Sequence, residues 1–219
     1  MIEFWLFRHG ETDWNRAGRL QGRTEIPLNS KGLEQVAELR DFLKPHAASF
    51  LKGVSSTLGR AQQTARLALP DLAWRLDEAW VETHLGVAEG LTRDEIVRRL
   101  GAESWDQWAD LSQNSWSASF VGGESRAQVR DRSLMALEAL RREILEASPS
   151  VKEGSASSAR VAISTHGGLL RRLIMHFHPD QATRISVPNA ALYVLKWDVT
   201  RGWQAEIEPR FVPRPRENN

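Results

Sequence analysis

The sequence predicts an α/β protein, a three-layer α/β/α sandwich with a mostly parallel central sheet and a small helical cap insertion. Short apolar segments alternate with longer segments whose apolar residues follow helical spacing, which is typical of a parallel sheet covered by helices. The chain has 219 residues, 41% of them hydrophobic, which is enough for one domain with a substantial core. We therefore expect a single domain over residues 1–219, with a cap insertion at about 92–122 and a flexible tail at about 209–219.

The first half of the chain begins with a buried strand. Residues 2–7 are short, apolar and rich in aromatic side chains, as buried strands often are. A helix then starts at Asn29 or Ser30, either of which can cap it, and stops near Pro45, because proline interrupts helical hydrogen bonding. The elements expected next are a weak strand at 53–56, a helix through 61–69 and a short strand at 74–76.

The second half of the chain contains the predicted cap. Residues 92–120 include one expected helix, at 92–100, and place Trp105, Trp108 and Trp116 among polar residues. These three tryptophans, with Phe120, either form an apolar lid over a pocket or pack the cap onto the core. The other expected elements are an amphipathic helix at 124–147, a polar surface loop at 148–159, a strand at 160–165, a helix at 167–177 and strands at 191–197 and 203–207.

Charge and composition exclude several classes of protein. The 29 basic and 28 acidic residues give a net charge of +1, which argues against a nucleic-acid partner but allows a small anion pocket. The chain has no cysteine, so disulfides, thiolate metal sites and cysteine nucleophiles are excluded. No segment approaches the ~20 apolar residues that span a bilayer, and the first residues lack the features of a signal peptide. We expect a cytoplasmic protein with no membrane partner.

A histidine followed by glycine comes directly after two of the predicted strands. His9 follows the first strand, and His166 follows the strand at 160–165. The carboxyl ends of parallel strands meet at one edge of a sheet, where ligands usually bind, so both imidazoles should face the same site. Arg8 and Arg60 also fall at this edge. Forked guanidinium groups beside paired histidines indicate an anion such as phosphate.

A series of short motifs extends this pattern over most of the chain. The first is residues 6–12, with the sequence LFRHGET, and the others are Asn15, 18–22, 27–32, 55–65, 82–90, 122–125, 165–168 and 188–190. Their sequences and order resemble the histidine phosphatase superfamily, which has the phosphoglycerate-mutase-like fold. Each motif is weak alone, but the ordered series is highly specific.

The resemblance implies a phosphoryl-transfer mechanism. His9 would be the nucleophile and would form a phosphohistidine, as a neutral imidazole in a fixed tautomer can. Arg8, Arg60 and His166 would surround the transferring phosphoryl group and stabilise its charge, so that no metal or other cofactor is needed. Glu82 would be the general acid that protonates the leaving group and later activates water.

Further residues would complete a cradle for the phosphate. The resemblance assigns this role to Asn15, to the backbone near Gln21 and Gly22, and to Gly167. A helix that begins at Gly167 would also point free backbone N–H groups toward a bound anion. His84 matches a position that lines the substrate side of the site in the mutases.

Two departures from the phosphoglycerate mutases favour net hydrolysis. Thr83 stands where those enzymes carry a basic residue after the acid, and residues 105–120 contain no Arg or Lys. A mutase must hold its released intermediate through a second anion site, and this segment offers none. The expected function is metal-independent hydrolysis of a small phosphorylated metabolite by a monomer or homodimer.

Three other interpretations stay open. The first is a cofactor-dependent phosphoglycerate mutase, which transfers a phosphoryl group between hydroxyls. The second is a catalytically weak module that binds a phosphorylated ligand, although all the residues of the chemical set are present. The third is a metallohydrolase that uses His9, Glu82, His84 and His166, although two arginines in the same pocket would repel a divalent cation.

Overall fold

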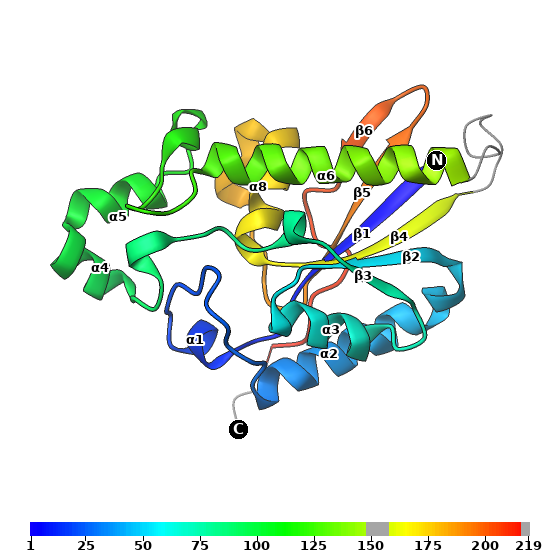
Figure 1. The fold of residues 1–219 in the computed structure, drawn as a ribbon, viewed down its shortest axis with the longest axis horizontal. Coiled ribbons are helices and arrows are strands. Elements are labelled where there is room, and N and C mark those ends of the chain that lie inside the picture. Colours follow the sequence, from blue (N-terminus) through cyan, green and yellow to red (C-terminus); the bar gives the residue numbers. More distant parts are fainter. Residues whose placement is uncertain (148–157, 216–219) are drawn as a thin grey trace.

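The computed structural model describes residues 1–147 and 158–215, and within them a six-stranded sheet runs through the centre of the molecule (Figure 1). Its strands are β1 (Ile2–Arg8), β2 (Phe50–Ser55), β3 (Trp74–Leu76), β4 (Ala159–Thr165), β5 (Leu192–Asp198) and β6 (Gly202–Ala205). The strand order is β3-β2-β4-β1-β5-β6. The first four strands are mutually parallel, whereas β5 is antiparallel to both of its neighbours.

Both faces of the sheet are buried. In β1, Phe4 and Leu6 belong to one apolar cluster, while Trp5 and Phe7 belong to another. Successive side chains of a strand point to opposite faces, so these clusters lie on the two sides of the sheet. The strand is apolar throughout because neither of its faces meets water.

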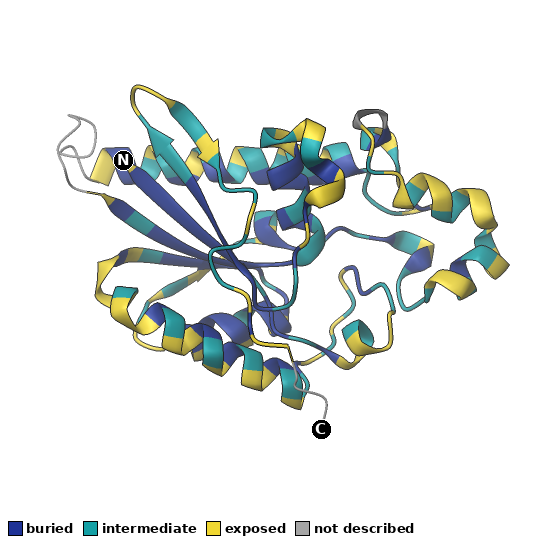
Figure 2. Cartoon of the chain, turned by 180° about the vertical axis from the view of Figure 1, so that it is seen from behind, coloured by how far each residue is buried: buried dark blue, intermediate teal, exposed yellow. Residues whose placement is uncertain are grey.

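Two pairs of helices cover these faces, with their exposed residues turned away from the sheet (Figure 2). Helices α6 (Arg126–Ala147) and α8 (Gly167–Phe177) pack on the side of Phe4. Helix α2 (Ser30–Leu43) packs on the opposite side with α3 (Gly59–Ala68). The predicted three-layer α/β/α fold class is confirmed.

Local signals set the helix ends. The Asn29 side chain caps α2 by accepting a hydrogen bond from the Gly32 N–H at 2.8 Å, and Pro45 lies in the turn directly after the helix. A short helix that was not predicted, α1 (Asp13–Arg16), is closed by a capping box from Thr12. The described 3₁₀ turns are η1 (Lys44–Ser49), η2 (Glu78–Trp80), η3 (Gly86–Ala88), η4 (Gln113–Ser117) and η5 (Pro179–Arg184).

Two helices of the predicted cap lie at one end of the molecule, far from the N-terminus (Figure 1). Helix α4 (Arg93–Leu100) was expected, whereas α5 (Ala102–Ala109) was not. No residue of α5 is fully buried, and Trp105 and Trp108 are its two large apolar residues, too few to reveal a helical repeat in the sequence. Ile96 and Phe120 form a small apolar cluster here, separate from the two clusters of the sheet.

The chain after β6 is packed against the domain as far as the structure describes it. Leu192 and Phe211 exchange backbone hydrogen bonds of 3.0 and 3.4 Å. The Phe211 ring stacks on Phe42 of α2, with 5.0 Å between the centroids. This part differs from the predicted flexible tail, because Phe211 adds to the apolar layer over the sheet. Residues 216–219, and the part of the predicted surface loop at 148–157, lie outside the described residues.

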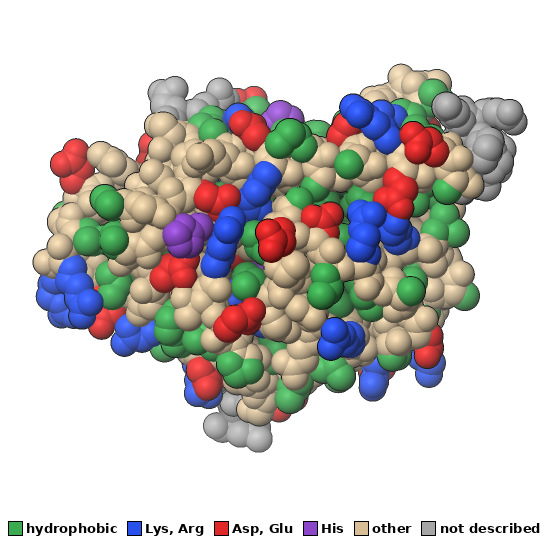
Figure 3. Space-filling model, in the orientation of Figure 1, with side chains coloured by type: hydrophobic (Ala, Val, Ile, Leu, Met, Phe, Trp, Pro, Cys, Tyr) green, Lys and Arg blue, Asp and Glu red, His purple; other side chains and the backbone are tan. Residues whose placement is uncertain are grey.

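Surface charge is distributed rather than gathered. On the face shown in Figure 3, basic and acidic side chains lie interspersed, in keeping with a net charge of +1. Among the described helices, none is long and apolar enough to cross a membrane.

Gly32→Ala should destabilise the fold. Within a helix, alanine is ordinarily ~1 kcal/mol more favourable than glycine. Here the new Cβ would lie 2.1 Å from the Glu11 backbone oxygen, so the loop after β1 would have to move. We expect chemical denaturation to show a loss of ~1–3 kcal/mol in the free energy of unfolding. Gly59→Ala is the matched control, because its Cβ would meet only the flexible Glu25 side chain, at 3.2 Å. Equal losses in the two variants would contradict this explanation.

Candidate active site

The carboxyl ends of three parallel strands meet at a cavity of about 430 Å³. Arg8 at the end of β1 pairs with Thr165 at the end of β4, so His9 and His166 follow their strands at the same height. The cavity opens between this edge and residues of α5. The predicted site residues that line it are Arg8, His9, Asn15, Gln21, Gly22, Arg60, Glu82 and Gly167.

His9 is held in one tautomer by the turn that follows it. The side chain is buried, and its Nδ1 lies 2.7 Å from the Gly10 carbonyl oxygen. A carbonyl only accepts hydrogen bonds, so Nδ1 carries the proton and Nε2 keeps its lone pair. The His9 backbone N–H donates to the Thr165 oxygen at 3.0 Å, which fixes the residue at the sheet edge. An imidazole held in this way can act as a nucleophile through Nε2.

His9 and His166 form a buried pair of uncharged imidazoles. Burial lowers the pKa of His9 well below its ordinary value of 6.5, and the charges of Arg60 and Arg8 lower it further. Burial and the charge of Arg60 likewise lower the pKa of His166 well below 6.5. The ring centroids are 5.2 Å apart, and His166 is hydrogen-bonded through Nε2 to the Ser56 hydroxyl at 2.7 Å. His166 therefore lies beside His9, although it is not among the residues that line the cavity.

Arg8 and Arg60 are oriented by main-chain carbonyl groups. Arg8 donates to the Val187 oxygen at 2.7 Å. Arg60, buried at the start of α3, donates to the oxygens of Gly22 at 2.7 Å and Thr24 at 2.8 Å. Burial lowers the pKa of Arg8 to about 10, so it is still cationic at neutral pH. A carbonyl orients a guanidinium group without neutralising it, so both charges remain available to an anion.

Glu82 occupies the N-terminus of α8. Its carboxylate accepts hydrogen bonds from the backbone N–H groups of Gly168 at 2.9 Å, Leu169 at 3.2 Å and Thr83 at 2.7 Å. The free N–H groups in the first turn of a helix attract negative charge. Gly168 permits this approach, because a Cβ there would lie 2.4 Å from the carboxylate. Glu82 thus takes N–H groups of the helix end that the sequence assigned to phosphate.

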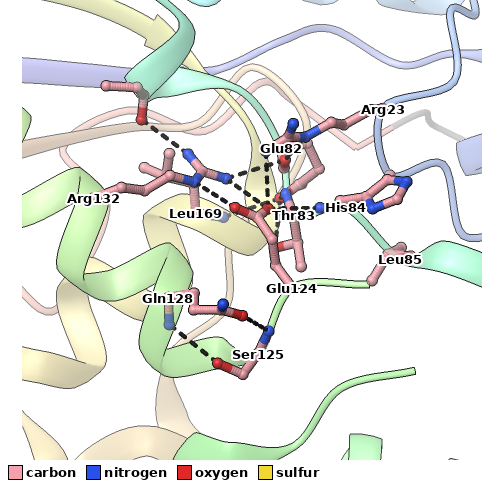
Figure 4. A network of polar contacts seen from close by, with 12 residues as sticks. Arg23, Glu82, Thr83, His84, Leu85, Glu124, Ser125, Gln128, Arg132 and Leu169 are labelled. Atoms are coloured by element: carbon pink, nitrogen blue, oxygen red, sulfur yellow. Dashed lines mark hydrogen bonds and ion pairs between the residues drawn. The ribbon is translucent and has the colours of Figure 1, made fainter. Parts of the chain in front are cut away.

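A charged network holds the segment that carries Glu82 (Figure 4). Arg132 of α6 donates to the backbone oxygens of Ala79 at 2.9 Å and Glu82 at 3.1 Å. The same guanidinium group pairs with Glu124 at 3.0 Å. Glu124 in turn accepts a hydrogen bond from the His84 N–H at 2.8 Å. The motif that contains Glu124 therefore positions the backbone on both sides of the candidate general acid.

Asn15 of α1 and Gln21, which follows α1, reach the cavity, whereas His84 does not. Asn15 accepts a hydrogen bond from the Asn189 amide at 2.9 Å, which leaves its own NH₂ group as a donor. Gln21 is buried, and its Oε1 has no partner among the described atoms. The His84 ring extends outward to Glu89, 3.8 Å from its carboxylate, with 45% of the side chain exposed. The structure therefore does not bring His84 into the site predicted for it.

Comparison with known proteins agrees with this arrangement. The model of the histidine phosphatase superfamily (branch 1) matches residues 4–207. The chain belongs to the histidine phosphatase superfamily. The family predicted from the motifs is thus confirmed.

Relatives within the superfamily include mutases and phosphatases. The 2,3-bisphosphoglycerate-dependent phosphoglycerate mutase 2 of Gloeobacter violaceus is 30% identical over 190 residues, which cover 83% of this chain and 80% of that protein. A mycobacterial glucosyl-3-phosphoglycerate phosphatase, solved with VO3, has a TM-score of 0.74 and 27% identity and covers 94% of this chain and 97% of that one. Bacillus stearothermophilus YhfR has a TM-score of 0.76 and 25% identity over 95% and 96% of the two chains. These relatives support a phosphoryl-transfer enzyme.

Two arginines of α8 that were not predicted also line the cavity of this superfamily member. Arg171 and Arg172 follow the second histidine motif along the chain. Residues 105–120 indeed contain no Arg or Lys, but the cations of the cavity come from a helix outside that segment. The observation about residues 105–120 therefore holds, but it does not extend to the whole cavity, to which Arg171 and Arg172 contribute guanidinium groups. The two successive arginines after the histidine motif were the signal that could have revealed them.

The tryptophans of the cap fall into two groups. Trp105 and Trp108 line the cavity. Phe120 packs on Trp108, with 5.0 Å between the ring centroids. Trp116 lies away from the cavity lining, 4.6 Å from the Arg130 guanidinium carbon. Both interpretations of the cluster thus describe part of it.

The residues considered for a metallohydrolase are not arranged as metal ligands. Over the parts of the chain that the structure describes, no group of three or more His, Asp or Glu side chains is placed to hold a metal ion. His84 lies outside the cavity, and Glu82 is bonded to the end of α8. This geometry does not favour the metallohydrolase interpretation.

The stability of the protein should depend on pH through its two buried imidazoles. The folded pKa values of His9 and His166 lie well below 6.5, so below this pH the unfolded chain binds protons that the folded chain does not. The free energy of unfolding should fall as the pH drops from 6.5 toward the folded values, by about 1.4 kcal/mol per histidine and pH unit. Chemical denaturation at roughly pH 7.5 and pH 5.5 measures this change.

The control is a His9→Gln, His166→Gln double variant, in which every other titratable group is retained. It should lose most of the pH dependence that the wild type shows in this range. A double variant whose stability falls as steeply as that of the wild type would show that other groups are responsible.

Proposed function

We propose that this chain hydrolyses a phosphomonoester of a small metabolite through a phosphohistidine formed on His9. The observation that carries the proposal is the neutral His9 imidazole, whose Nε2 lone pair is free in a cavity that also contains Arg8 and Arg60. An uncharged nucleophile approaches a phosphate dianion without repulsion. The two guanidinium groups compensate the charge of the phosphoryl oxygens during transfer.

The reaction proceeds in two steps on the same atom. In the first step, Glu82 enters as a carboxylic acid: Nε2 of His9 attacks phosphorus, the bond to the leaving oxygen breaks, and Glu82 gives that oxygen its proton and becomes a carboxylate. In the second step, Glu82 takes a proton from a water molecule, the water oxygen attacks phosphorus, and the phosphorus–nitrogen bond breaks. His9 returns to its neutral form, so that one water molecule is consumed while one alcohol and one phosphate are released.

The relatives support phosphoryl transfer but differ in its outcome, since one named above is a mutase and another a phosphatase. We favour hydrolysis because Thr83 replaces the basic residue that follows the acid in the mutases. Phosphoglycerate mutase activity is the second candidate, and Arg171 and Arg172 favour it because a mutase needs a second anion site. A binding module would need the arginines but not a nucleophile in a fixed tautomer.

His9→Asn should abolish phosphate release, with a loss of at least roughly 10³-fold in kcat, because the other imidazole, His166, is bonded through Nε2 to Ser56 and is not among the residues that line the cavity. The measurement is phosphate release from p-nitrophenyl phosphate and a panel of phosphorylated metabolites, with and without EDTA. Rapid quenching and mass spectrometry should find phosphate on His9 in the wild type. His84→Asn makes the same change outside the cavity and should retain activity. A wild type that interconverts 3- and 2-phosphoglycerate faster than it releases phosphate would be a mutase.

Glu82→Gln should slow hydrolysis most for poor leaving groups. An alkoxide must be protonated as it departs, whereas p-nitrophenolate leaves without a proton. We expect kcat/KM to fall by about 10²-fold or more for an alkyl phosphate and much less for p-nitrophenyl phosphate. The glutamine oxygen can still accept hydrogen bonds from Gly168 and Leu169, so the local structure should persist. Equal losses for the two substrates would assign Glu82 to positioning instead.

A further inference from the structure

The cavity holds a second group of arginines besides Arg8 and Arg60. Arg171 and Arg172 of α8 contribute to its lining. Arg171 lies close enough to Arg8 for its charge to lower the pKa of Arg8. The two groups of arginines therefore act within one site, and a bound molecule of metabolite size can meet both.

Arg172 is a buried cation that forms no ion pair among the described residues, although the charge of Glu82 lies close enough to raise its pKa. The residue is 4% exposed, and its Nε has no hydrogen-bond partner among the described atoms. Within the described residues, its one hydrogen bond runs from Nη1 to the Met175 sulfur, at 3.5 Å. Burial and the charges of Arg126 and Arg171 lower the pKa of Arg172 to about 9, so it is still cationic at neutral pH. Burying a charge without a partner is strongly unfavourable, which points to a partner that binds.

Arg171 is also free, unlike the neighbouring arginines. In the part of the chain that the structure describes, Arg171 has no hydrogen bond or ion pair. Arg126, by contrast, donates to the backbone oxygens of Asp110 and Trp108. Arg19, which also lines the cavity, pairs with Glu95 at 2.7 Å. Among the described arginines that line the cavity, Arg171 and Arg172 are therefore the two whose guanidinium groups contact no carbonyl or carboxylate oxygen.

The cap contacts the same arginines. The guanidinium carbons of Arg126 and Arg172 lie 5.2 and 5.5 Å from the centroid of the Trp108 ring. Trp105 lines the cavity as well. Apolar rings beside a cationic group limit its access to water and so strengthen its attraction for an anion.

We propose that Arg171 and Arg172 bind a second anionic group, a carboxylate or a phosphate, on the leaving group of the substrate. This inference rests on the proposed function, because it names the class of phosphomonoester that the site takes. The phosphoryl group that reacts lies near His9, between Arg8 and Arg60, and the second anion receives the forked donors of α8. The two α8 arginines determine specificity and take no part in the bond-making steps.

The test compares substrates that differ only in the second anion. D-3-Phosphoglycerate carries a carboxylate where glycerol 3-phosphate carries a hydroxymethyl group, and fructose 1,6-bisphosphate has one more phosphate than fructose 6-phosphate. The wild type should prefer the more anionic member of at least one pair by ~10-fold or more in kcat/KM. The pair that shows the preference distinguishes carboxylate from phosphate. Arg171→Met and Arg172→Met should each reduce the preference by ~10-fold or more, whereas Arg66→Met, on the exposed face of α3, should not.

Thermal unfolding separates this role from simple packing. Methionine has nearly the length of arginine and can still contact Trp108. Because Arg172 is a buried charge that forms no ion pair among the described residues, Arg172→Met should keep or raise the Tm. A lower Tm for Arg172→Met, together with an equal fall in kcat/KM for both substrates of each pair, would overturn the proposal. Arg172 would then have a structural role.

Binding is measured separately, so that turnover is not required. Calorimetric titration of the His9→Asn protein with the same pairs should show tighter binding of the more anionic member. This difference should shrink when Arg172→Met is added. No phosphate release by the wild type, with the binding preference retained, would overturn the proposed hydrolysis alone. Equal affinities within each pair would overturn the second anion site.

Discussion

The site depends on positive charge that main-chain carbonyl groups hold at the carboxyl edge of the sheet. Arg60 is buried, and its two terminal nitrogens donate to loop carbonyls, so its charge is oriented but not neutralised. The same charge, together with burial, keeps His9 and His166 unprotonated. The arginines thus give the cavity its positive charge and also help to keep the His9 imidazole neutral. Both properties favour a dianionic ligand.

The position of Glu82 follows from the same constraint. A carboxylate this close to the arginines would neutralise them if it paired with them directly. Its charge still raises the pKa of Arg8 and Arg60, but its hydrogen bonds go to the first turn of α8. Arg132 and Glu124 hold the backbone that makes this placement possible. The fold therefore keeps an acid inside a cationic cavity without an ion pair to Arg8 or Arg60 among the described residues.

Residues next to strand ends could be predicted from the sequence, because the sheet topology alone brings them together. His9 and His166 follow parallel neighbouring strands, so their proximity needed only the alternation of strands and helices. Arg171 and Arg172 could not be placed in this way, because which face of a helix meets the cavity depends on how the helix packs. The structure does not place His84 in the predicted site for a related reason, because the ring points outward to Glu89. Sequence patterns therefore locate the phosphoryl site better than the part of the cavity that selects the substrate.

Hydrolase and mutase differ in what happens to the alcohol after His9 is phosphorylated, and this depends on the second group of arginines more than on His9. If the leaving group is held, it competes with water for the phosphohistidine; if it dissociates first, water is the remaining acceptor. If Arg171 and Arg172 bind an anion of the leaving group as we propose, they would slow its dissociation, and Trp105 and Trp108, which line the same cavity, would limit the entry of water. The absence of basic residues from 105–120 therefore does not decide the reaction. What decides it is how long α8 retains the dephosphorylated product relative to the attack of water.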